Sequence, residues 1–265
     1  MATHSPTSRY GRLATLAYGF LCYAVFFGVF LYSIAFIGNF DVVPKTIDTG
    51  ESGPFATALL LNLGLLSLFA VQHSLMARPA FKAFWTKIIP EPIERSTYVL
   101  FSSLCLIALF AFWQPLSGPT IWQITPGGAA SAVIGVYLFG WAMLLYAIAL
   151  IGHFELFGVR QVWYAYHGEP YPTNPFVTPG LYKRMRHPIY VAWTVIFWAT
   201  PSMSAGHLFF AVVTTTYMIL AVFIEERDLV DHFGDAYRRY QETTPKFFPK
   251  WSVEKAQGDT AATPA

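Results

Sequence analysis

The sequence predicts an all-α, polytopic integral membrane protein with about five to six transmembrane helices, a C-terminal helical hairpin and a cytoplasmic cap. Two observations support this fold class. Hydrophobic residues make up 55% of the 265 residues and charged residues only 12%, so the chain is more apolar than a soluble domain of this size can bury. The apolar residues also gather into runs near the ~20 residues that a helix needs to cross ~30 Å of hydrocarbon.

Four of these runs are each long enough for one crossing, and they cover residues 13–37, 55–76, 97–112 and 129–151. A further stretch, residues 188–224, is too long for a single crossing. Its interior contains Pro-Ser-Met-Ser-Ala-Gly at residues 201–206, a sequence that breaks a helix. We therefore expect two closely spaced helices that turn back on each other.

The basic residues predict the orientation of the helices. Lys and Arg concentrate before the first run, in residues 78–95 and 160–186, and after residue 227, whereas loops 38–54 and 114–128 carry one Lys and no Arg. Positively charged loops stay on the cytoplasmic side of a membrane. Both termini and both basic loops are therefore expected in the cytoplasm.

Composition also limits the partners. The net charge of +2 is too small to indicate a nucleic-acid partner, so we expect membrane lipid and small molecules instead. No feature of the sequence indicates an obligate protein partner. The seven His show no close metal-ligand spacing, and we expect no metal.

Residues 152–188 form a connection too long to be a simple turn. The segment holds several aromatic residues, among them Trp163 and Tyr164, and prolines that stiffen it. Loops of this length are usually functional or disordered, and this composition favours a folded cap that walls off a small cavity. We expect residues 1–251 to form a single membrane domain and residues 252–265, rich in Ala, Thr, Gly and Pro, to be disordered.

Charged residues flank the last apolar stretch. Arg186 and His187 come directly before Pro188, and Glu225 and Glu226 follow the stretch. Charged groups near lipid usually meet a polar partner or mark a site, and Pro188 favours the first turn of a helix, whose N-terminus stabilises an anionic group. The alternatives are a cationic anchor at the membrane surface and a solvated helix end carrying the two carboxylates.

Further motifs accompany these residues, namely Gly180-Leu181-Tyr182, Tyr190, and Phe233-Gly234-Asp235 with Tyr237 and Tyr240. Together with Arg186-His187-Pro188 and Glu225-Glu226, they resemble the signature of the isoprenylcysteine carboxyl methyltransferase and phospholipid methyltransferase group. One position departs from that signature, because Ala192 stands before Trp193 where the group often has Gly. Members of the group are integral membrane enzymes that use S-adenosylmethionine.

The resemblance implies a cofactor-binding part in residues 152–251 and S-adenosylhomocysteine as a product. The residues that it implies for cofactor binding are Tyr182, Arg186, His187, Pro188, Tyr190, Glu225 and Glu226.

Upstream segments narrow the resemblance. The stretch from Gln72 to Arg78, the motif Glu94-Arg95-Ser96 with Tyr98, and the stretch from Gly152 to Gln161 look like the bacterial branch that contains methanethiol S-methyltransferases and NnrU-like membrane proteins. This branch implies methyl transfer from S-adenosylmethionine to methanethiol, giving dimethyl sulfide. It also implies the inner membrane of a bacterium, and the orientation expected from the basic residues puts the active site on the cytoplasmic side.

A thiol acceptor adds a requirement, because the thiolate is the nucleophile and a base or a positive field must generate it. The candidate catalytic residues are His73, His153 and Arg160. The candidate substrate-binding residues are Gln72, Glu155, Trp163 and Tyr164. A structural alternative exists for both groups: a hydrogen bond that packs helices for Gln72 and His73, and an ion-pair network that holds the cap closed for His153, Glu155 and Arg160.

Two other functions remain open. The first is a methyltransferase that acts on an isoprenylcysteine or phospholipid type of acceptor, and it would share the cofactor site. The second is a non-enzymatic NnrU-like membrane protein or carrier. A carrier is expected to have repeated halves with broken helices in corresponding positions, whereas this chain has one interrupted segment.

Overall fold

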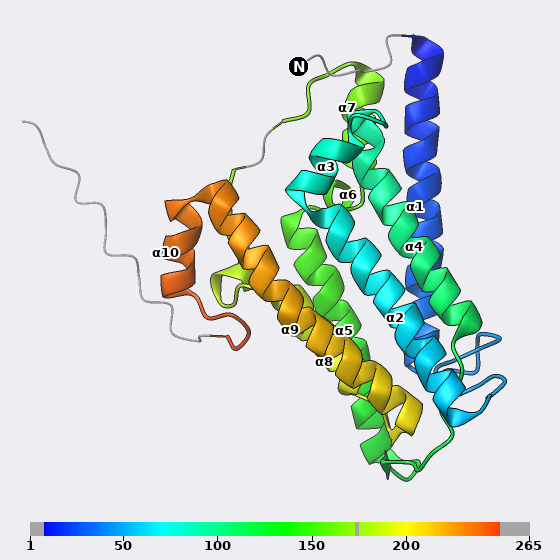
Figure 1. Ribbon diagram of the computed structural model, residues 1–265. Helices are drawn as coiled ribbons and strands as arrows, with labels where there is room; N and C mark the ends of the chain where they lie inside the picture. The colour runs from blue at the N-terminus through cyan, green and yellow to red at the C-terminus, as the bar shows by residue number, and fades with distance from the viewer. Residues whose placement is uncertain (1–7, 173–174, 250–265) are drawn as a thin grey trace, which may run out of the picture.

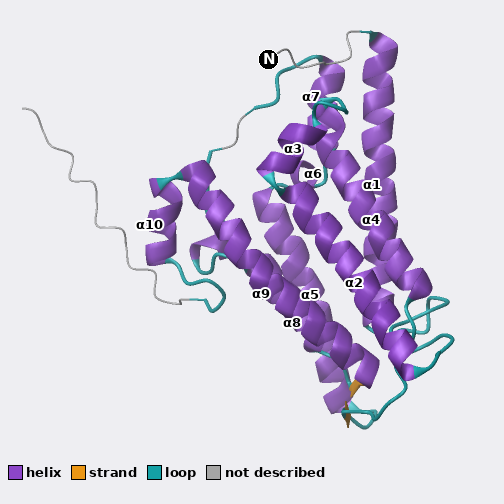
Figure 2. Cartoon of the chain, viewed as in Figure 1, coloured by secondary structure: helices purple, strands orange, loops and turns teal. Residues whose placement is uncertain are grey.

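The computed structural model describes residues 8–172 and 175–249. Within these residues, long helices form a bundle with shorter helices gathered toward one end (Figure 1). The strands of the described residues form one two-stranded ribbon near the other end (Figure 2). The predicted all-α polytopic fold is confirmed, while the tail expected at residues 252–265 lies outside the described residues.

Within residues 8–172 and 175–249, five helices are long and apolar enough to cross a membrane. They are α1 (Arg9–Ile37), α2 (Phe55–Ala77), α4 (Glu94–Phe112), α5 (Gly128–Ile151) and α9 (Ala205–Phe233). The four separate apolar runs of the sequence fall inside α1, α2, α4 and α5, as predicted. Hydrophobic length was therefore sufficient to locate these crossings.

The outer surface of the bundle is apolar. Leu60, Phe139 and Leu220 are 69%, 63% and 60% exposed. Leaving a side chain of this size in water costs about 1.5–3 kcal/mol relative to burying it. Such a surface suits the hydrocarbon of a bilayer, and the chain is an integral membrane protein.

The last apolar stretch forms the predicted hairpin, with one short arm. Helix α8 (Pro188–Trp198) has 11 residues and rises only about 16 Å. The chain then continues through β2 (Ser202–Met203), which pairs antiparallel with β1 (Trp122–Gln123). Ser204 caps α9 by accepting a hydrogen bond from the His207 amide at 2.9 Å, so the turn that the sequence placed at 201–206 has a defined structure.

The shorter helices lie toward the end where α8 begins and α9 finishes (Figure 1). They are α3 (Pro79–Trp85), η1 (Glu91–Ile93), α6 (His153–Leu156), α7 (Val159–His167), η2 (Gly180–Lys183) and α10 (Asp235–Thr243). This end also carries most of the Lys and Arg residues of the described chain. Charge is therefore concentrated at one end of the bundle.

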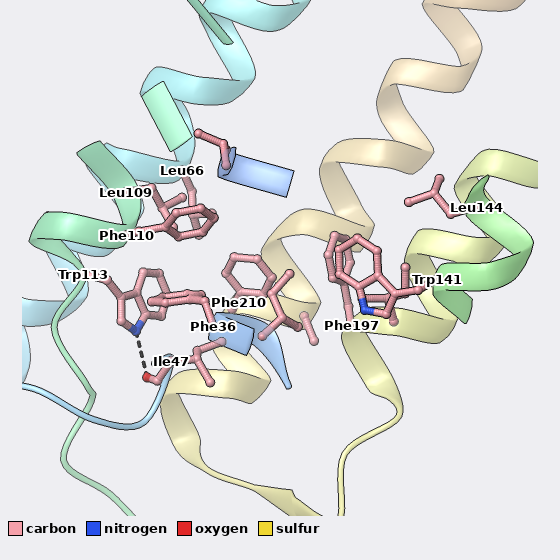
Figure 3. Close-up of a cluster of buried hydrophobic side chains, with 14 of the residues drawn as sticks. Phe36, Ile47, Leu66, Leu109, Phe110, Trp113, Trp141, Leu144, Phe197 and Phe210 are labelled. Atoms are coloured by element: carbon pink, nitrogen blue, oxygen red, sulfur yellow. Dashed lines mark hydrogen bonds between the residues drawn. The ribbon is translucent and has the colours of Figure 1, made fainter. Parts of the chain in front are cut away.

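Aromatic side chains pack the opposite half of the bundle (Figure 3). The ring centroids of Phe36 and Phe110 lie 4.7 Å apart, and those of Trp113 and Phe210 lie 5.7 Å apart. The Trp113 indole N–H donates to the carbonyl oxygen of Ile47 at 2.9 Å, the dashed line in Figure 3. This bond attaches the loop after α1 to the core, since a buried indole N–H needs a partner.

The connection after α5 is folded, as predicted. Gly152 and Gly158 have φ values of 97° and 84°, which side chains other than glycine rarely adopt. Between them, α6 turns the chain back against the start of α4, where Arg95 Nε donates to the Leu156 carbonyl at 2.9 Å and Ser96 Oγ donates to the Gly158 carbonyl at 3.3 Å. Helix α7 then packs against α1.

Gly158→Ala is expected to destabilise the protein by more than about 1–3 kcal/mol, the usual cost of a residue held in a strained conformation. A Cβ atom at this position would lie 2.6 Å from both the amide nitrogen and Oγ of Ser96, so the strain adds to a clash with backbone. The free energy of unfolding in detergent micelles measures the effect. Gly64→Ala is the control, because its Cβ would meet nothing within 4 Å; equal losses at the two positions would contradict the prediction.

Candidate active site

A cavity of about 210 Å³ lies where α8 begins, between the last turns of α5 and α9. One part of its wall is apolar and includes Ile151, Phe176, Ile189 and Leu229. The rest is polar, and its residues are Thr178, Tyr182, Arg186, His187, Glu225, Tyr190, Tyr237 and Tyr240. An apolar pocket with a few convergent polar groups is the usual form of a small-molecule site.

Glu225 is the carboxylate on the cavity wall. Its Oε2 accepts a hydrogen bond from the Tyr190 hydroxyl at 2.6 Å, which joins α9 to the first turn of α8. Tyr182, on η2, lines the same cavity, and burial raises the pKa of its phenol. The hydroxyl of Tyr182 therefore stays protonated and able to donate a hydrogen bond.

Glu226 has a different environment. It is only 7% exposed, and its Oε1 accepts from Arg186 Nε at 2.7 Å and from His187 Nε2 at 3.0 Å. Its Oε2 lies 3.2 Å from Lys246 Nζ and accepts from the side-chain Nε2 of Gln241 at 3.3 Å. A buried carboxylate needs such partners, and these protein groups already engage both oxygens.

Arg186 is also held by the protein. Besides its bond to Glu226, it donates through Nη1 to the carbonyl of Gln241 at 3.0 Å and to that of Thr244. Its side chain is 9% exposed. The guanidinium is therefore fixed at the edge of the cavity by α9, α10 and the segment that follows α10.

Helix α8 begins at this cavity. Pro188 occupies its first turn, where the missing N–H costs nothing and the fixed φ favours helix. Pro188 and Ile189 both line the cavity. The partial positive charge of the helix N-terminus therefore faces this site, and it favours an anionic group there.

A second polar cluster lies between α2 and α4. The Tyr98 hydroxyl is 3.0 Å from each ring nitrogen of His73, and Ser102 Oγ is 3.3 Å from His73 Nδ1. The neighbouring Gln72 donates to Met76 Sδ at 3.1 Å, and its Oε1 is buried without a hydrogen-bond partner among the described residues. We call His73, Tyr98, Ser102 and Gln72 the His73 cluster.

The His73 cluster is a neighbour of the cavity. Its helix α2 contacts α9, the helix that carries Glu225. Tyr217, on α9, shares a hydrogen bond of 2.9 Å with Ser74, and Arg78 pairs with Asp228 at 2.7 Å. These two contacts join α2 to α9 beside the cavity.

Comparison with known proteins places the chain in a family. The phospholipid methyltransferase profile matches residues 131–236. Methanethiol S-methyltransferase 2 of Bradyrhizobium diazoefficiens is 46% identical, over 94% of this chain and 95% of that protein. The methanethiol S-methyltransferases of Crocosphaera subtropica and Mycobacterium tuberculosis are each 44% identical, over 90% of this chain and 92% and 97% of theirs. This chain belongs to the methanethiol S-methyltransferase family. No solved structure matches it.

In this member of the methanethiol S-methyltransferase family, the residues predicted to bind the cofactor lie together. Six of the seven line the cavity, namely Tyr182, Arg186, His187, Pro188, Tyr190 and Glu225. The seventh, Glu226, accepts hydrogen bonds from Arg186 and His187. The phospholipid methyltransferase profile spans all seven. The structure thus brings together motifs separated by a whole helical hairpin.

The remaining predicted residues form a separate group against α1. His153 Nε2 is 2.8 Å from the Tyr23 hydroxyl, and Arg160 pairs with Glu155 at 2.8 Å. Burial lowers the pKa of His153, which favours its neutral form. Arg160 lies 5.6 Å above the Tyr164 ring, while Trp163 is 50% exposed.

This group is not part of the cavity wall. Among the described residues that line the cavity there is none from α6 or α7. The predicted cap is therefore divided: residues 176–178 contribute to the cavity, whereas the bulky aromatic residues of α6 and α7 pack elsewhere. In the methanethiol S-methyltransferase family member described here, the base candidates His73 and His153 occupy different clusters.

Sequence reasoning missed several residues of the methanethiol S-methyltransferase site. Lys246 and Gln241 bind Glu226, and the Tyr217 hydroxyl shares a hydrogen bond with Ser74, the residue after His73. Tyr98 was recognised as part of the Glu94-Arg95-Ser96 motif, but no role in the site was predicted for it. Lys246 had no signal in the sequence, because its importance depends on how the chain folds back after α10.

Proposed function

We propose that this protein is a membrane-bound S-methyltransferase that transfers the methyl group of S-adenosylmethionine to methanethiol. The products are dimethyl sulfide and S-adenosylhomocysteine, and the thiol proton is released. The observation that carries the proposal is the similarity to methanethiol S-methyltransferases over nearly the whole chain, combined with a cavity lined by the residues of the methyltransferase signature.

The residues of the cavity fit the cofactor chemically. S-adenosylmethionine has a carboxylate, an ammonium, a ribose diol and an adenine, so its site needs donors, an anion and an apolar slot. The α8 N-terminus with Arg186 and His187 would hold the carboxylate, and Glu225 with Tyr190 would accept from the ammonium or the diol. Ile151, Phe176 and Leu229 would pack against the adenine.

When bound, the cofactor supplies a methyl group already activated by its sulfonium. The protein then has two tasks: it aligns the thiolate sulfur in line with the methyl carbon, and it excludes water. The new S–C bond would form as the bond from the methyl carbon to the sulfonium sulfur breaks. The apolar wall and the packed tyrosines of the cavity suit both tasks.

The acceptor must lose its proton, and we assign this step to the His73 cluster. A ring nitrogen of His73 takes the thiol proton, with Tyr98 and Ser102 orienting the imidazole. Gln72, whose Oε1 has no partner among the described residues, is the proposed substrate-binding neighbour.

We assign a supporting role to the second cluster. His153, Glu155, Arg160 and Tyr164 hold one another and α1 through the contacts already described. They fix the fold of α6 and α7, which precede the cavity residues Phe176 and Tyr182 in the chain. The exposed Trp163 belongs to α7.

We further propose that the protein lies in the inner membrane of a bacterium with its active site facing the cytoplasm. The distribution of Lys and Arg supports this orientation. The ion pairs Arg78–Asp228, Arg160–Glu155 and Arg186–Glu226 also lie toward the end of the bundle that carries the basic residues. A charged cofactor and its charged product would then meet water directly.

The test is headspace detection of dimethyl sulfide from the purified full chain in detergent, supplied with S-adenosylmethionine and methanethiol. Calorimetric titration of the cofactor runs beside it. We expect product and cofactor binding together. Cofactor binding with methylation of a phospholipid or an isoprenylcysteine instead of methanethiol would overturn the acceptor. Absence of binding in a folded sample would overturn the enzymatic function.

A further inference from the structure

The chain after α10 returns to the start of α8. We call residues 244–248 the strap. The backbone amide of Arg186 donates to the Pro245 carbonyl at 2.9 Å, and the amide of His187 donates to the Lys246 carbonyl at 3.1 Å. These amides directly precede Pro188, so the strap satisfies two donors just ahead of the helix.

Side chains attach the strap to α9. Lys246 Nζ lies 3.2 Å from Glu226 Oε2 and 4.1 Å from the centre of the Phe223 ring. The Lys246 side chain is 24% exposed and that of Glu226 is 9% exposed. This ion pair is therefore largely shielded from water, and it is stronger than a pair on an open surface.

The strap contacts residues of the cavity wall without lining the cavity itself. Arg186 and His187 line the cavity, but no described strap residue does. The Arg186 guanidinium also donates to the carbonyl of Thr244, the first residue of the strap. Both the backbone and the side chain of Arg186 thus depend on the strap for their position.

We propose that Lys246 is a positioning residue for the proposed S-adenosylmethionine site. Its bond to Glu226 holds the strap against α9, and the strap in turn fixes Arg186 and His187 at the cavity wall. The identity of the ligand rests on the proposed function. Glu226 accordingly organises this wall, whereas Glu225 is the carboxylate available to the ligand.

The test compares Lys246→Ala, Lys246→Gln and Lys246→Arg in the full chain, with Lys87→Ala as control because Lys87 is exposed on the loop after α3. Hydrogen exchange is followed at the Arg186 and His187 amides, and S-adenosylhomocysteine is titrated by calorimetry. KM for S-adenosylmethionine and kcat are measured separately. Gln keeps most of the side-chain length and guards against a variant that fails to fold.

Lys246→Ala and Lys246→Gln are expected to raise exchange at both amides and to raise the Kd and KM about tenfold, with kcat nearly unchanged, because a hydrogen bond to a charged group is lost. Lys246→Arg is expected to restore all three, and Lys87→Ala to change none. Faster exchange with normal affinity, or weaker affinity with normal exchange, would overturn the role of the strap. Failure of the unmodified protein to bind S-adenosylhomocysteine would instead overturn the proposed function, and this inference with it.

Discussion

Glu226→Ala is expected to lower the free energy of unfolding by about 3–5 kcal/mol, the usual cost of removing one partner from a buried ion pair. The change removes the acceptor of Arg186, His187 and Lys246 together. The guanidinium, which is 9% exposed, would stay buried without its counter-ion. Denaturant titration in detergent micelles measures the loss.

Glu225→Ala is the matched control, since it deletes the neighbouring carboxylate. Glu225 accepts one bond from Tyr190 and belongs to the cavity wall, so we expect a loss of stability below about 1.5 kcal/mol. Its main effect should be on the cofactor, with an affinity about 10- to 100-fold lower. Equal stability losses for the two variants would show that their roles are not divided in this way.

The second large effect is expected in turnover. Tyr98→Phe and His73→Gln are each expected to lower kcat by about 10²–10⁴-fold, the range for loss of a positioned proton acceptor or its support. Tyr98→Phe removes the hydroxyl that lies 3.0 Å from both ring nitrogens of His73 while keeping the ring. Affinity for S-adenosylhomocysteine should not change, because neither residue lines the cavity. Single-turnover measurement of dimethyl sulfide formation separates the chemical step from product release.

His153→Gln provides the comparison for these two variants. His153 contacts Tyr23 at 2.8 Å, in the cluster against α1, so we expect kcat to fall by less than tenfold. If His153→Gln abolished turnover and His73→Gln spared it, the assignment of the proton acceptor would be reversed. Rescue of His73→Gln by raising the pH, which supplies thiolate from solution, would support the assigned role.

The fold was predictable wherever the length of an apolar run determined the structure. An apolar run of about 20 residues in lipid has few alternatives to a helix, and α1, α2, α4 and α5 follow the predicted runs closely. The interruption at residues 201–206 also marked the hairpin correctly. The end of α8 agrees with that interruption, since the helix stops at Trp198, three residues before Pro201.

The site was predictable in its motifs and not in its division of tasks. Sequence indicated Arg186, His187 and the two adjacent Glu residues together, but their separate roles depend on helical geometry. Successive residues on a helix differ by about 100° in direction, so Glu225 meets the cavity while Glu226 meets Arg186. Lys246 could not be anticipated, since a backbone that folds back after α10 leaves no periodic pattern in the sequence.

The position of the cavity has a consequence for how the reaction finishes. Its wall joins charged groups such as Glu225 and Arg186 to apolar ones such as Ile151, Ile189 and Leu229. The two proposed products differ in the same way, because one is a charged nucleoside and the other a small volatile sulfide. We expect them to partition into different phases, the first into water and the second into lipid. Because one cavity lies at the boundary between water and lipid, neither product needs a dedicated channel to leave it.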